Sequence, residues 1–148
     1  KWSALQRPQF SGPVYQFGMS KSVALLKIFP GMDIDLYKGL FDASQTKGIV
    51  LETFGSGNAP SIDKMQGIMT RYVEEGGLII NITQCSSGGV KQGAYQTRSF
   101  FNKIGVISGS DMTAEAALTK LMFALGNEED LKKVKDLIAI PICGEMER

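Results

Sequence analysis

The chain has 148 residues, of which 43% are hydrophobic and 21% charged, and its 16 basic and 15 acidic side chains leave a net charge of +1. This composition is typical of one globular domain, and the near-zero charge gives no attraction to nucleic acid or to an anionic membrane surface, so we expect neither as a partner. No apolar run approaches the ~20 residues of a membrane span, and the first residues do not form a signal peptide. Because no Met opens the chain, we expect it to begin inside a larger protein or to have been cut.

Residues 1–20 contain two prolines and two glycines and show no sustained hydrophobic period, which indicates an irregular arm or linker. From residue 21 onward, short apolar runs alternate with segments of helical spacing. In the first half we predict a strand at 23–29, a helix capped by Asp33 that reaches about residue 43, a strand at 48–54, and a helix that begins at 60 or 61 and stops at the glycines 76–77.

The second half continues the alternation with a strand at 78–83, helical spacing at 95–103, a brief strand at 105–107 and a helix capped by Thr113. A last helix from about residue 128 should direct Leu131, Val134, Leu137 and Ile138 inward. Strands that are apolar on both sides and alternate with helices indicate a parallel sheet. We therefore predict an α/β fold, a small three-layer domain with a roughly four-stranded parallel sheet flanked by helices.

Histidine is absent, and cysteine occurs only as Cys85 and Cys143. Without histidine, imidazole-based triads, His-ligated metals and the usual general base near neutral pH are excluded. Two cysteines are too few for a disulfide framework and do not match a zinc spacing. We therefore expect two reduced, mostly buried thiols in a cytoplasmic protein, and no zinc or His-ligated metal site.

Three polar segments follow predicted strands, at the end of a parallel sheet where ligands usually bind: 55–58, 83–89 and 108–113. Asn58 has a donor and an acceptor at a helix entrance, which suits a carboxylate or amide ligand, although an ordinary turn capped by Asn58 explains the same residues. Cys85 has no base or cation near it in the sequence, so its segment is better explained as a small-ligand or interdomain loop than as a nucleophile site. Helix capping explains most of the third segment. Composition and spacing thus favour a binding or accessory domain.

The strings LETFGSGNAP (51–60), NITQCSSGGV (81–90) and GVISGSDMTAEAALTKL (105–121) resemble the C-terminal domain of type I, cytoplasmic bacterial L-asparaginases, in the same order and at similar separations. The resemblance covers about residues 20–146. It implies an enzyme that hydrolyses L-asparagine to L-aspartate and ammonia without a cofactor, as a homodimer or homotetramer. The nucleophilic threonine of a Thr-Gly-Gly stretch, and a Thr-Asp pair with a Lys, would lie in a larger N-terminal catalytic domain.

Nothing in this chain matches those catalytic motifs, so we expect residues 21–148 to be the smaller domain, without catalytic residues and inactive alone. The resemblance implies that Asn58, preceded by Gly57, reaches the substrate amino group in the neighbouring subunit's site. It also implies an effector site for asparagine at Thr83 and Cys85. Glu52 aligns with an Arg of that effector site, and a carboxylate repels the effector's carboxylate, so we expect no allosteric control.

Two other interpretations remain open. One is an autonomous amino-acid-binding regulatory module that uses the same pocket without hydrolysis. The other is the matching domain of a glutaminase-asparaginase or of a tRNA amidotransferase subunit, although the near-neutral charge disfavours an RNA partner.

Overall fold

A computed structural model describes residues 12–13, 15–54, 63–85, 89–90 and 96–147. Its four strands form one sheet in the order β1-β2-β3-β4, and all three pairings are parallel, which confirms the predicted fold class. The strands are β1 (Val23–Lys27), β2 (Gly48–Thr53), β3 (Leu78–Thr83) and β4 (Ile107–Ser108). The helices are the 3-10 helix η2 (Ile34–Phe41) and the α-helices α1 (Asp63–Glu74), α2 (Gln96–Ile104), α3 (Ala114–Asn127) and α4 (Leu131–Ala139).

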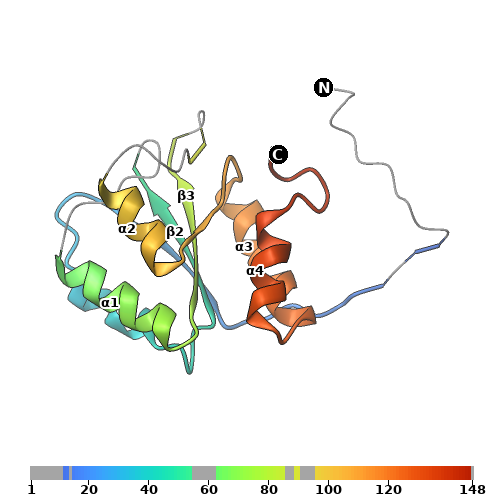
Figure 1. The fold of residues 1–148 in the computed structure, drawn as a ribbon, viewed down its shortest axis with the longest axis horizontal. Helices are drawn as coiled ribbons and strands as arrows, with labels where there is room; N and C mark the ends of the chain where they lie inside the picture. The colour runs from blue at the N-terminus through green and yellow to red at the C-terminus, as the bar shows by residue number, and fades with distance from the viewer. Residues whose placement is uncertain (1–11, 14, 55–62, 86–88, 91–95, 148) are drawn as a thin grey trace.

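The sheet separates two layers of helices (Figure 1). Each of η2, α1 and α2 connects one strand to its next neighbour, and because the three crossovers run in the same direction along the sheet, a common handedness places them on one face. The chain then passes β4, and α3 and α4 cover the opposite face. Each face of the sheet therefore has its own hydrophobic core.

Side chains alternate between these two cores along the central strands. From β2, Ile49 and Leu51 pack with Met69 and Tyr72 of α1 on one face, whereas Val50 packs on the other face, with the core that α3 and α4 build. Residues of β2 and β3 face each other from the pair Gly48–Leu78 to the pair Thr53–Thr83. The two strands consequently end at the same edge, which we call the carboxyl edge of the sheet.

Most predicted elements are present, with modest differences at their ends. β3 has the predicted bounds, whereas β1 and β2 end at Lys27 and Thr53, earlier than predicted. Thr113 caps α3 as predicted, since its Oγ1 accepts the N–H of Ala116 at 3.2 Å. Gly76 ends α1 with a φ of +94°, as a glycine after a helix should. The start predicted for that helix, at 60 or 61, lies outside the described residues.

The segment after Asp33 is a 3-10 helix, although Asp33 does cap it by accepting the N–H of Asp35 at 3.0 Å. Its apolar residues Ile34, Tyr37 and Leu40 recur every three positions, which matches the three residues per turn of a 3-10 helix.

The fourth strand is displaced from the predicted range of 105–107 to 107–108, because Gly105 takes a φ of +82° and terminates α2. Leu131, predicted to face inward, is 40% exposed, since it opens α4 next to the cap Asp130. The prediction of buried thiols was also wrong. Cys85 and Cys143 are free and exposed, because one follows the end of β3 and the other lies beyond α4.

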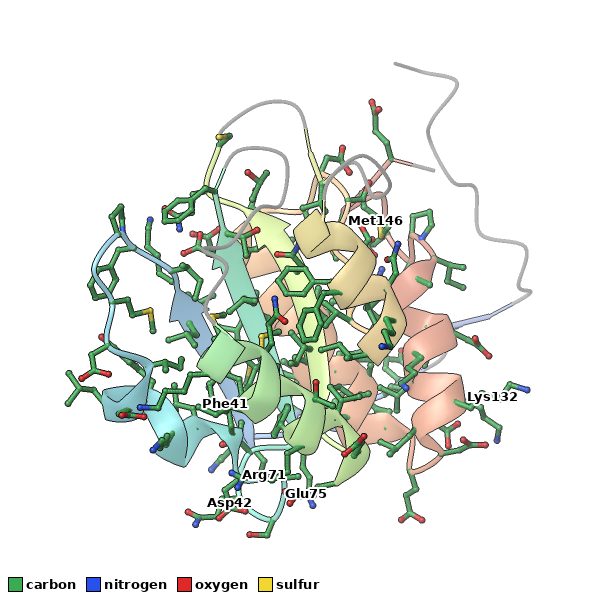
Figure 2. All side chains as sticks on the ribbon, turned by 60° about the vertical axis from the view of Figure 1, so that its left-hand side comes forward. Phe41, Asp42, Arg71, Glu75, Lys132 and Met146 are labelled. Carbon is green, nitrogen blue, oxygen red and sulfur yellow. The ribbon has the colours of Figure 1, made fainter. Side chains whose placement is uncertain are left out.

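The C-terminal tail, residues 140–147, is fastened to α3 by a buried ion pair. Nζ of Lys120 lies 2.5 Å from Oε1 of Glu145, and the two side chains are 3% and 11% exposed. The same ammonium donates to the carbonyl oxygen of Ile140 at 2.5 Å. Figure 2 shows Met146 of this tail at the end of the molecule opposite to Arg71 of α1. The tail therefore folds back onto the domain instead of extending from it.

Hydrogen bonds stabilise the ionised form of Glu145. Burial alone would raise the pKa of this carboxyl group, but hydrogen bonds from Lys120 and from the main-chain N–H groups of Cys143 and Ile142 outweigh burial and hold the pKa well below its ordinary value. A carboxyl group with a lower pKa in the folded chain stabilises the fold above its unfolded-state pKa, and this contribution is lost as the pH falls through the folded-state value. The hydrogen bond to Glu145 also raises the pKa of the Cys143 thiol.

We predict that Glu145→Gln lowers the free energy of unfolding at pH 7 by about 3–5 kcal/mol, because the Lys120 ammonium stays buried without its counter-charge. The difference from the wild type should shrink as the pH falls below 4.5, the ordinary pKa of this group. Urea titrations at several pH values measure both effects. The exposed Glu129, replaced by Gln, is the matched control, and equal stability of Glu145→Gln and the wild type would contradict the prediction.

Candidate functional site at the carboxyl edge of the sheet

The strands that precede the three predicted polar segments in the sequence, β2, β3 and β4, all end at the carboxyl edge, because the sheet is parallel throughout. The first segment, with Gly57 and Asn58, lies outside the described residues. The residues just before it are described, because β2 ends at Thr53 and Phe54 follows. The contacts of these residues can therefore be followed one by one.

A buried polar pair joins the end of β2 to the middle of β3. Thr53 is fully buried, and Asn81, in the middle of β3, is 2% exposed. The hydroxyl of Thr53 donates to Oδ1 of Asn81 at 2.7 Å, and the carbonyl oxygen of Ile82 lies 3.1 Å away. The main-chain carbonyl of Asn81 accepts the N–H of Gly109, the residue that follows β4, at 2.7 Å. Because buried polar groups are costly unless they are hydrogen-bonded, these contacts determine where β2, β3 and β4 end relative to one another.

Gln84 continues this network beyond the last pair of strand residues. Its main-chain N–H donates to the carbonyl of Thr53 at 2.9 Å. Its side-chain Nε2 donates to the carbonyl oxygens of Ile28, at 2.6 Å, and of Glu52, at 3.0 Å. One residue thus contacts the main chain of β2 and the residue that follows β1.

The structure brings two of the three candidate effector residues together. Oγ1 of Thr83 accepts the main-chain N–H of Cys85 at 3.0 Å, which forms a tight turn directly after β3. Glu52 lies elsewhere. Its register partner on β3 is Ile82, so alternation along the strands directs Glu52 and Thr83 to opposite faces of the sheet. The Glu52 carboxylate lies 3.9 Å from Nζ of Lys27, on the neighbouring strand β1.

The third predicted segment borders a hollow of about 740 Å³. Ser108 and Ser110 line it together with Ile140 and Met146 of the C-terminal tail, so the carboxyl end of β4 and the tail border the same hollow. Ser110 has a φ of +53°, and its N–H donates to Oγ of Ser108 at 3.2 Å. The hydroxyl of Ser108 is thus engaged in the turn, and most of the lining is apolar.

Charged groups elsewhere serve the local structure. The pKa of Asp42 is lowered because its carboxylate accepts hydrogen bonds from the side chain and the main chain of Ser44, and Figure 2 shows Asp42 at the end of the molecule away from Met146. Within the described ranges, no group of three or more His, Cys, Asp or Glu side chains is placed to hold a metal ion. No helix in those ranges is long and apolar enough to cross a membrane.

Sequence reasoning missed Thr53, Asn81 and Gln84 as residues that shape the site. The signal for the first two was present, because each is a polar residue inside an otherwise apolar strand, GIVLET or LIINIT. A polar residue in such a run must find a buried partner. Gln84 left no comparable signal, since a glutamine that follows a strand is ordinary and only the structure shows its contacts.

Comparison with known proteins places this arrangement in a family. The model of the glutaminase/asparaginase C-terminal domain matches residues 22–138, which include all four strands. In the crystal structure of L-asparaginase I from Vibrio cholerae, the similar region has a TM-score of 0.84 and 31% sequence identity, and the match covers 93% of this chain and 42% of that chain. Sequence and fold therefore agree over most of the chain.

Two curated relatives extend the comparison. A glutamyl-tRNA(Gln) amidotransferase subunit of Methanopyrus kandleri is 34% identical over 145 residues, covering 98% of this chain and 31% of that protein. L-asparaginase 1 of Escherichia coli K12 is 33% identical over 124 residues, covering 84% of this chain and 36% of that protein. The chain thus spans about a third of the length of these relatives. It belongs to the glutaminase/asparaginase C-terminal domain family.

Proposed function

We propose that the chain is the C-terminal domain of a cytoplasmic L-asparaginase, which hydrolyses L-asparagine to L-aspartate and ammonia. The family match over residues 22–138 carries this proposal, supported by the similarity to L-asparaginase 1 and to the fold of L-asparaginase I. The catalytic threonines would belong to an N-terminal domain in the remaining two thirds of the protein. This domain would contribute Asn58 and Gly57 to the substrate site and contacts to a homodimer or homotetramer.

Exposed apolar side chains support a role within a larger assembly. Tyr15 and Phe17 stack with ring centroids 6.1 Å apart, and Phe17 is 85% exposed. Met19, Leu25 and Phe29 are also exposed, and Leu25 and Phe29 lie in or shortly after the edge strand β1. Exposed apolar groups of this size are typical of surfaces that a partner covers. The N-terminal domain or a second copy of the protein is the expected partner.

A second candidate function is favoured by the relative from Methanopyrus kandleri, whose similarity extends over 98% of this chain. In this alternative the chain is the matching domain of a tRNA amidotransferase subunit. The net charge of +1 gives the domain little attraction for tRNA, so the asparaginase interpretation remains the preferred one. The third candidate function is an autonomous amino-acid-binding module, for which we expect binding of the amino acid without hydrolysis.

Activity assays separate these functions. We predict that the 148-residue chain releases no ammonia from L-asparagine or L-glutamine, whereas the full-length protein releases it from L-asparagine. A coupled assay for ammonia, run with both amino acids and both proteins, measures this. Turnover by the 148-residue chain alone would show that it contains its own catalytic groups, and binding without turnover by the full-length protein would favour the regulatory module.

For the full-length enzyme, we predict that Asn58→Ala lowers kcat/KM for L-asparagine by roughly 10- to 100-fold. The reason is the loss of one hydrogen-bond partner of a charged ammonium group, about 1.5–3 kcal/mol. Steady-state kinetics measure the change, and Asn102→Ala, an exposed position on α2, is the matched control. Unchanged kinetics in Asn58→Ala would mean that this residue only caps a helix.

The surroundings of Glu52 support an enzyme without allosteric activation by asparagine. A carboxylate at this position, beside Lys27 and directed away from the face of Thr83, does not offer the positive charge that an amino-acid carboxylate needs. We predict a hyperbolic dependence of the rate on L-asparagine concentration, both in the wild type and in Cys85→Ser. Initial rates over a wide concentration range test this, and a Hill coefficient clearly above one would refute it.

A further inference from the structure

We propose that Gln84 is a positioning residue, which holds the end of β2 and thereby fixes the base of the loop that carries Asn58. The inference rests on the proposed function, because it concerns the substrate contact assigned there to Asn58. Gln84 itself is not expected to touch the substrate.

The side-chain amide of Gln84 has both of its N–H donors engaged. Both partners, Ile28 and Glu52, present carbonyl oxygens, so the nitrogen and not the oxygen of the amide must face them. Together with the main-chain N–H that binds the carbonyl of Thr53, Gln84 makes three hydrogen bonds to its neighbours. Two of these bonds are made to consecutive residues of β2.

These bonds lie where the regular ladder between β1 and β2 stops. The last register pair is Lys27–Glu52, and the carbonyl of Glu52 then accepts the N–H of Ile28 at 3.0 Å. Gln84 adds a second donor to the same carbonyl and a donor to the carbonyl of Ile28. Gln84 thus holds Ile28, the residue after β1, next to the end of β2. The strand pairing between β1 and β2 has already ended at this point.

The position of this contact in the chain gives it a functional consequence. Asn58 follows Thr53 by only five residues, so a shift of the Glu52–Thr53 main chain displaces the base of its loop. An error of about 1 Å in a substrate-positioning group is enough to cost as much as 100-fold in rate. Gln84 also lies between Thr83 and Cys85, so the turn after β3 and the end of β2 form one hydrogen-bonded unit.

The test uses the full-length protein with Gln84→Met, which keeps the length of the side chain without donors, and Gln84→Glu, which keeps its shape but places a carboxylate against two carbonyl oxygens. Gln45→Met is the matched control, because Gln45 is exposed and its Nε2 donates to Asp42, away from the carboxyl ends of the strands. We expect both Gln84 variants to raise KM for L-asparagine about 5- to 20-fold, with a smaller change in kcat. Peptides covering 52–58 should exchange their amide hydrogens faster than in the wild type, whereas those of α3 should not.

The outcomes distinguish the two proposals. If the wild type does not hydrolyse L-asparagine, the proposed function is wrong, and amide exchange at 52–58 still decides whether Gln84 holds the end of β2. Unchanged exchange there in both Gln84 variants would overturn the inference. A lower melting temperature with unchanged KM would also overturn it, because Gln84 would then serve stability alone.

Discussion

The parallel ladder between β2 and β3 brings the ends of two buried strands to one edge of the sheet, in a register that runs from Gly48–Leu78 to Thr53–Thr83. Both strands are covered by helices on both faces, so a shift by one residue would exchange the side chains of the two cores. The same register determines which residues leave the sheet together. The base of the loop with Asn58 and the turn at Thr83 are neighbours for this reason.

At the carboxyl edge, polar contacts hold the strand ends in specific positions, which the apolar cores cannot do. Hydrophobic burial is not directional, so it keeps strands together without determining where each one ends. The hydrogen bond between Thr53 and Asn81, and the contact of Asn81 with Gly109, link specific atoms of β2, of β3 and of the residue that follows β4. On the side of the sheet that α3 and α4 cover, the pair of Lys120 and Glu145 has the same role for the C-terminal tail. A small number of buried polar groups therefore determines the geometry at the edges of an otherwise apolar fold.

Much of the fold could be predicted from sequence, because the apolar runs of β2 and β3 and the stripe of Met65, Met69 and Tyr72 on α1 are strong local patterns. The sequence contained a signal for the 3-10 type of η2, the three-residue spacing of Ile34, Tyr37 and Leu40, which the prediction missed. The bounds of β4 could not be predicted, since the conformation of Gly105 decides them. For the candidate site, sequence located the segments but not their contacts. The partners of Gln84 are 32 and 56 residues away in the chain, and no local pattern reports contacts over such separations.

The ion pair of the C-terminal tail bears on where this domain stops. The match to the family model ends at residue 138, within α4, whereas the carboxylate that neutralises Lys120 belongs to residue 145. A domain boundary placed at the end of this match would therefore separate Lys120 from Glu145. A protein truncated there would keep a buried ammonium group without its counter-charge. For expression, for fusion to another protein, or for delimiting the domain in longer relatives, the boundary should lie no earlier than Glu147, whose N–H donates to Asp111 at 2.8 Å.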